Sequence, residues 1–140
     1  MVEGACVLDL FAGSGALGIE ALSRGAAEAT FVDDDPGALS VVRANLAATG
    51  LGAAATVVRS DAGRFLRSGP VWFDLALLDP PYSLDDGGWA DLLAMLPAAV
   101  VALESDRAIE PGAGWEVLRS RRYGSTVVTL ARAGEGGEAR

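Results

Sequence analysis

Residues 7–18 read VLDLFAGSGALG, an apolar run that leads into a loop with glycines at positions 13, 15 and 18. The run Ala5–Leu10 predicts a buried strand, and Gly15–Arg24 predicts a helix that stops at Gly25. A strand, a G-x-G-x-x-G loop and a helix in this order let a ligand approach the backbone, next to free N–H donors and the positive end of a helix dipole. This arrangement is typical of cofactor-binding α/β proteins, and its usual ligand is a dinucleotide.

The alternation of strands and helices continues along the chain. Asp35, Pro36 and Gly50 delimit the clearest helix, because they supply a cap, a first-turn proline and a stop signal. The alternation predicts one α/β domain over residues 1–132, with a doubly wound, mostly parallel sheet, and a disordered tail over residues 133–140. Further strands are expected at Ala29–Val32, Thr56–Arg59, Phe73–Leu78 and Val100–Leu103, further helices at Pro36–Thr49 and around Trp89–Leu96, and an antiparallel edge hairpin at Trp115–Arg122 and Ser125–Leu130.

Composition narrows the possible chemistry. The sequence has no histidine and a single cysteine, Cys6. These counts exclude an internal disulfide and Ser–His or Cys–His catalysis within the chain, and they lead us to expect no metal site. No apolar run approaches the roughly 20 residues of a membrane span, so we expect a cytoplasmic protein without membrane contact. A formal net charge of −8 argues against nonspecific nucleic-acid binding by the chain as a whole.

An aspartate stands at the end of each of the first four predicted strands, at positions 9, 33, 61 and 79. Asp9 would set a negative charge against a dinucleotide pyrophosphate, whereas a sulfonium cofactor with an ammonium group would be attracted to it. S-adenosylmethionine is such a cofactor, and Asp33 can accept hydrogen bonds from its ribose hydroxyls. Asp61 suits either the adenine edge or a helix N-cap, and the two roles can coexist. A nicotinamide-binding domain is the alternative interpretation of the glycine loop.

A second stretch, LALLDPPYS at residues 75–83, places Asp79 and two prolines directly after an apolar strand. A carboxylate there costs free energy unless it is paired or solvated, and the prolines remove two backbone donors. Taken alone, the stretch is equally well explained as a proline-rich turn that ends a strand. In open α/β sheets, however, ligands bind beyond the carboxyl ends of strands at the point where strand order reverses, and the first and fourth strands would flank that point. We therefore expect Asp79 beside the glycine loop.

Four stretches together resemble one family: VLDLFAGSGALGIEALSRGA, FVDDD, LLDPPY and RRYGSTVVTL. The sequence is similar to class I S-adenosylmethionine-dependent methyltransferases with the D/N-P-P-Y/F motif of exocyclic-amine methylation, and more narrowly to the RsmD-type family. The resemblance implies a Rossmann-like, seven-stranded sheet in the order 3-2-1-4-5-7-6 with strand 7 antiparallel. It also implies methyl transfer to N2 of a guanine in small-subunit (16S) ribosomal RNA, within the assembling subunit, by a protein that we expect to be a monomer.

The resemblance assigns roles residue by residue. In the implied reaction, the Asp79 carboxylate and the Pro80 carbonyl accept hydrogen bonds from the N–H groups of the target amine and so free its lone pair. Tyr82 stacks on the base. Proton loss accompanies or follows transfer, so that no strong base is needed. The implied catalytic residues are Asp79, Pro80, Pro81 and Tyr82, and the implied cofactor-binding residues are Asp9, Phe11, Ala12, Gly13, Ser14, Gly15, Asp33, Asp34, Asp61 and Ala62.

One departure from the family concerns RNA binding. Members usually begin with a basic extension that contributes to RNA binding, whereas this sequence begins at Met1-Val2-Glu3-Gly4, almost directly on the first strand. We therefore expect these residues alone to bind RNA weakly. Arg119, Arg121 and Arg122 could contact phosphate or lie on a solvated hairpin. The alternative functions are methylation of an adenine amine in DNA or RNA or of a protein amide, and a non-catalytic cofactor-binding module.

Overall fold

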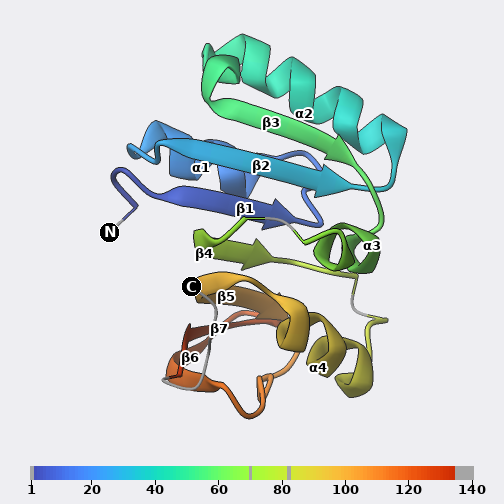
Figure 1. Cartoon of the computed structure of the whole chain (residues 1–140), viewed down its shortest axis with the longest axis vertical. Helices are drawn as coiled ribbons and strands as arrows, with labels where there is room; N and C mark the ends of the chain where they lie inside the picture. Colours follow the sequence, from blue (N-terminus) through green and yellow to red (C-terminus); the bar gives the residue numbers. More distant parts are fainter. Residues whose placement is uncertain (1, 70, 82, 135–140) are drawn as a thin grey trace.

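The structure, a computed structural model, describes residues 2–69, 71–81 and 83–134 (Figure 1). Within these residues, seven strands form one sheet in the order β3-β2-β1-β4-β5-β7-β6. Strands β1 to β5 are parallel to one another, and β7 is antiparallel to both β5 and β6, which confirms the predicted sheet. The strands are β1 (Cys6–Leu10), β2 (Glu28–Asp33), β3 (Ala55–Arg59), β4 (Phe73–Leu78), β5 (Ala98–Ser105), β6 (Trp115–Tyr123) and β7 (Thr126–Ala133).

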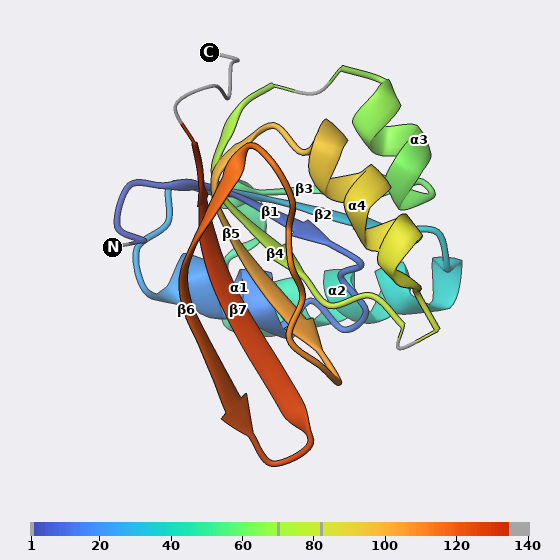
Figure 2. The ribbon, with the colours of Figure 1, turned by 90° about the horizontal axis from the view of Figure 1, so that it is seen from below.

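Helices cover both faces of this sheet. Helices α1 and α2 pack on one face, over β1, β2 and β3, and α3 and α4 lie on the other face (Figures 1 and 2). Each face therefore has its own apolar core, as expected for a doubly wound arrangement. The helices are α1 (Ala16–Ser23), α2 (Pro36–Thr49), α3 (Ala62–Arg67) and α4 (Asp86–Met95), with a short 3-10 turn at Gly52–Ala54 before β3.

Helix α2 has the bounds that its sequence signals predict. The Gly37 N–H donates to the Asp35 side chain at 3.1 Å, Pro36 occupies the first turn, and Gly50 ends the helix in the left-handed conformation with φ 74°. Leu39, Val42 and Leu46 lie on its buried side, one or two turns apart. Capping and spacing act within a few residues, which is why the sequence alone identifies this element.

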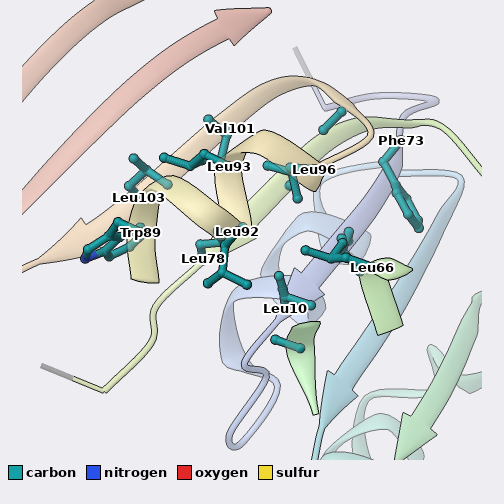
Figure 3. Packing of buried hydrophobic residues seen from close by; sticks show 14 of the residues in the cluster. Leu10, Leu66, Phe73, Leu78, Trp89, Leu92, Leu93, Leu96, Val101 and Leu103 are labelled. Carbon is teal, nitrogen blue, oxygen red and sulfur yellow. The ribbon is translucent and has the colours of Figure 1, made fainter. Parts of the chain in front are cut away.

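The larger core lies between the sheet and helices α3 and α4 (Figure 3). Leu92, Leu93 and Trp89 of α4 pack on Leu78 and Leu103, which pair in neighbouring strands β4 and β5. Burial of such side chains stabilises the fold by about 1.5–3 kcal/mol each. This core supports the end of β4, from which residue 79 leaves the sheet.

Three local expectations differ from the structure. Gly15 does not begin the first helix, because its φ of 83° is left-handed and makes it the N-cap residue instead. The sequence does not predict the extent of helix α3, although Asp61 suits a helix N-cap, since the six residues of this helix are too few to show a helical period. Strand β5 extends at both ends beyond Val100–Leu103, because Ala98 pairs with Phe73 of β4 and the pairing with β7 continues to Ser105.

Strand β7 reaches Ala133, the first residue of the stretch for which we expect a tail, and residues 135–140 of that stretch lie outside the described residues. Among the described residues, no helix combines the length and the apolar character needed to cross a bilayer.

Candidate functional site

The glycine loop leaves β1 with unusual backbone angles. Phe11, Gly13 and Gly15 all have positive φ, at 76°, 57° and 83°. Glycine adopts this region freely, but at Phe11 it costs about 1–2 kcal/mol. Two hydrogen bonds hold the strained segment, because the N–H groups of Phe11 and Ala12 both donate to the Val32 carbonyl, at 3.1 and 2.9 Å. The end of β2 thereby fixes the loop.

Asp33 fixes the same loop with its side chain. One carboxylate oxygen accepts the Gly13 N–H at 2.9 Å, and the other accepts the Asp35 N–H at 3.0 Å. The neighbouring Ser14 carbonyl accepts the Asn45 side-chain amide of α2 at 3.0 Å. Asp33 therefore joins the glycine loop to the start of α2, and its remaining lone pairs are at the edge of the pocket described below.

Asp9 lies beneath the loop and is only 2% exposed. Its carboxylate accepts the Gly18 N–H at 3.0 Å, in the first turns of α1. Burial raises the pKa of Asp9 to about 7, and the negative charges of Asp79 and Asp33 add to this rise, while the hydrogen bond from Gly18 opposes it. In this geometry Asp9 supports the start of α1, and it is not among the residues that line the pocket described below.

A pocket of about 140 Å³ opens at the carboxyl ends of the first four strands. Each of the four segments that follow those strands contributes to it, as expected for an open α/β sheet at the point where strand order reverses, between β1 and β4. Acidic and apolar groups line it, and none of the described lining residues is basic. The lining residues are Phe11, Val32, Asp33, Asp34, Ser60, Asp61, Ala62 and Pro81.

Asp61 has the capping role that was one of its two expected roles. Its side chain accepts the Arg64 N–H at 2.9 Å and so begins α3, while Ala62 is the first helical residue. Both residues line the pocket at the same time. The cap explains why the short helix starts here, and it leaves one face of Asp61 toward the pocket.

The Asp-Pro-Pro segment leaves β4 beside the same pocket. Asp79 is exposed and Pro80 is buried, and Pro81 lines the pocket and accepts the Leu84 N–H at 3.0 Å. The surroundings of the Asp79 carboxyl withdraw it partly from water, and this raises its pKa. Tyr82 lies outside the described residues.

Sequence and structure comparisons place these features in a family. Residues 1–132 match the family described as "Conserved hypothetical protein 95". A putative rRNA methyltransferase, YlbH, of Bacillus subtilis is 48% identical over 141 residues, which cover 91% of this chain and 76% of that protein. The chain belongs to the RsmD-type family.

Two further similar proteins agree with this assignment. Ribosomal RNA small subunit methyltransferase D of Escherichia coli K12 is 34% identical over 153 residues, covering 99% of this chain and 73% of that protein. The solved structure of the putative methyltransferase yhhF from Escherichia coli superposes with a TM-score of 0.83 at 33% identity, over 95% of this chain and 77% of that chain.

One residue of this RsmD-type chain forms contacts near the site that the sequence did not predict. Arg107, in the segment between β5 and β6, donates to the Leu84 carbonyl at 3.3 Å and pairs with Asp86 at 2.8 Å and Asp106 at 3.1 Å. The hydrogen bonds to Asp86 and Asp106 raise the pKa of Arg107, and the contacts with Leu84 and Asp86 tie the segment after the prolines to the end of β5. Asp86 and Leu84 lie 21 and 23 residues away in the chain, so no local pattern could have identified these two contacts.

Glu104, near the end of β5, faces Asp79. Burial and the negative charge of Asp79 raise the pKa of Glu104. The described residues contain no group of three or more Asp, Glu, His or Cys side chains arranged to hold a metal ion.

Proposed function

We propose that this chain transfers a methyl group from S-adenosylmethionine to the exocyclic N2 amine of a guanine in small-subunit (16S) ribosomal RNA. The observation that carries the proposal is the pocket, because it brings together the segments after β1, β2, β3 and β4, the last of them through Pro81, two residues after Asp79. The names of the relatives favour ribosomal RNA over DNA or protein as the substrate.

The pocket lining suits a nucleoside better than a dinucleotide. The carboxylates of Asp33, Asp34 and Asp61 can accept hydrogen bonds from ribose hydroxyls and an adenine amine, and apolar side chains flank them. The same carboxylates would repel a pyrophosphate, since the described lining offers no cation in return. This chemistry supports S-adenosylmethionine over a nicotinamide cofactor.

When bound, S-adenosylmethionine supplies an electrophilic methyl group on a positively charged sulfur. The chain's own residues position the amine that receives it. The Asp79 carboxylate and the Pro80 carbonyl accept hydrogen bonds from its two N–H groups. The nitrogen lone pair is then less delocalised into the ring and can attack the methyl group. Tyr82, assigned by the motif alone, stacks on the base. Positioning of this kind can account for roughly 7–11 kcal/mol of a barrier.

We propose that the enzyme is a monomer and that it acts in the cytoplasm. Its target is a guanine that the assembling small subunit leaves accessible, either in a loop or flipped from its stack.

Two measurements test the proposed function. Calorimetry should show binding of S-adenosylhomocysteine and none of NAD, and Asp33→Ala should weaken that binding by about 1–3 kcal/mol through loss of a charged acceptor. Asp91→Ala, on the exposed side of α4, is the control. Incubation with labelled S-adenosylmethionine and small-subunit RNA, followed by mass spectrometry of the nucleosides, should yield N2-methylguanosine. Methyladenosine, or NAD binding alone, would contradict the proposal.

A further inference from the structure

The hairpin of β6 and β7 differs in charge from the rest of the molecule. Residues 115–133 contain four arginines and one acidic residue, Glu116, whereas residues 1–114 contain six arginines and sixteen acidic residues. A positively charged hairpin on an acidic body offers a polyanion one attractive surface and repels it elsewhere. The face of the hairpin that such a ligand would contact depends on the side of the sheet on which these arginines lie.

Strand register assigns each arginine of β6 to a face. The Ser120 hydroxyl lies 3.4 Å from that of Thr129, which is 1% exposed and belongs to the side of the sheet covered by α4. Side chains alternate along a strand, so Arg122 lies on the same side as Ser120. Arg119 and Arg121 lie on the opposite face, together with their β7 partners Leu130 and Val128.

Alternation along the strand places Asp79 on that opposite face as well, because Leu75 and Leu77 of β4 pack against the core beside α1 and α2. Leu78 and Leu103 form the last pair between β4 and β5, and Asp79 and Glu104 are the next residues. Burial raises the pKa of Glu104, and the nearby negative charge of Asp79 adds to the rise. Glu104 pairs with Val128 of β7, which pairs with Arg121 of β6. A row across the sheet therefore leads from Asp79 to Arg121 over three interstrand spacings, roughly 14 Å.

The row crosses an accessible part of the sheet. Helices α1 and α2 lie over β1, β2 and β3 (Figure 1), on the same face as the row. Over residues 100–105 of β5 and 127–131 of β7, the side chains on the α4 side are buried, whereas those on the row's side are only half-buried. The half-buried residues are Val100, Ala102, Glu104, Val128 and Leu130.

The exposed groups on β6 suit single-stranded RNA. Arg132 forms an ion pair with Glu116 at 2.8 Å, but Arg119 and Arg121 are exposed. Tyr123, two residues after Arg121 on the same face, is 57% exposed at the hairpin tip. Guanidinium groups that contact phosphates, next to an aromatic ring that can stack on a base, are the elements of single-strand recognition.

We propose that Arg119, Arg121 and Tyr123, together called the β6 face, bind the single-stranded RNA that flanks the target base. The proposal rests on the proposed function, which sets the target base at Asp79. Arg119 and Arg121 contact backbone phosphates, and Tyr123 stacks on a base. Arg122 takes no part, because it lies on the other side of the sheet.

The test compares neighbouring arginines in the full chain. Arg121→Gln and Arg122→Gln remove the same charge from adjacent exposed positions on opposite faces. Affinity for deproteinised small-subunit ribosomal RNA is measured over a range of salt concentrations. Arg121→Gln should lower the slope of log affinity against log salt by about 0.7, and Arg119→Gln/Arg121→Gln by about 1.4, with an affinity loss of about tenfold. Tyr123→Ala should weaken binding by about fivefold or more, and Arg122→Gln should stay within about twofold of wild type.

A second readout separates docking from catalysis and from folding. The double variant should raise the KM for RNA, while its single-turnover rate at saturating RNA, its affinity for S-adenosylhomocysteine and its melting temperature stay at wild-type values. Equal effects of Arg121→Gln and Arg122→Gln, or no RNA binding by wild type, would overturn the proposal. A contrast seen only with assembled small subunits would assign the β6 face to a ribosomal protein and overturn it too. Absence of methyl transfer by wild type would instead remove the proposed function.

Discussion

Asp79 combines two properties at the end of β4: an exposed position beside the pocket, and a pKa that partial removal from water raises. A residue that only stabilised a turn would affect folding, whereas an acceptor for the target amine would affect the reaction. The two roles therefore predict different effects of replacing Asp79 with alanine.

We expect Asp79→Ala to lower single-turnover methylation by about 10²–10⁴-fold, the range for one positioned polar catalytic group. Asp79→Asn, which keeps a carbonyl acceptor, should retain more activity than Asp79→Ala. Thermal melting and affinity for S-adenosylhomocysteine should change little in both variants. A folded Asp79→Ala protein with a near-normal rate would exclude Asp79 from the mechanism.

Asp9 makes stability depend on pH. The pKa of Asp9 is about 7 in the folded protein, whereas the ordinary pKa of an aspartate is 3.8. At a pH between these two values, the folded state keeps a proton that the unfolded state has lost. Between these values the free energy of unfolding falls as pH rises, at about 1.4 kcal/mol per pH unit. The contribution is fully present below the ordinary pKa and is lost as pH approaches 7.

Chemical unfolding at pH 5 and pH 7.5 measures this effect against Asp9→Asn, which keeps an acceptor for the Gly18 N–H but cannot ionise. Wild type should lose about 2–3 kcal/mol more than Asp9→Asn over this interval. Identical pH dependence of the two proteins would show that Asp9 remains charged in the fold.

At the scale of elements, the packing of α1 on β2 depends on one glycine. A Cβ atom on Gly18 would lie 2.5 Å from Cε2 of Phe31 and 3.0 Å from the Asp9 carboxylate. Phe31 is fully buried, so the helix itself would have to move, and with it the hydrogen bond that supports the loop.

Gly18→Ala should therefore destabilise the protein by about 1–3 kcal/mol, although alanine favours a helix over glycine by about 1 kcal/mol. Gly52→Ala is the control, because nothing lies within 4 Å of a Cβ at that site. Urea unfolding of both variants measures the difference. A Gly18→Ala protein as stable as Gly52→Ala would mean that α1 can shift at no cost.

At the scale of the whole molecule, charge decides the response to nucleic acids. The net charge of −8 predicts weak binding to duplex DNA of random sequence at moderate salt, whatever the β6 face contributes locally. A filter-binding titration at about 150 mM salt should show no saturation below the concentrations at which S-adenosylhomocysteine saturates the pocket. Tight, strongly salt-dependent binding of that DNA would contradict this expectation.

The sequence by itself determined those features that depend on near neighbours. Strand and helix periods, the cap and proline of α2, and the acids that follow four strands all act within a few residues, and the resemblance carried by four motifs supplied the strand order. The structure confirmed that order, and it placed Phe11, Asp33, Asp34, Asp61, Ala62 and Pro81 around one pocket.

Only the tertiary structure decided the rest. Arg107 contacts Leu84 and Asp86, more than 20 residues away, Asp9 is buried under its own loop, and Arg121 and Arg122 face opposite sides of the sheet. These outcomes depend on which strands pair and in what register, and a shift of one residue would exchange the two faces. Register is set by packing across the whole sheet, which no short stretch of the sequence contains.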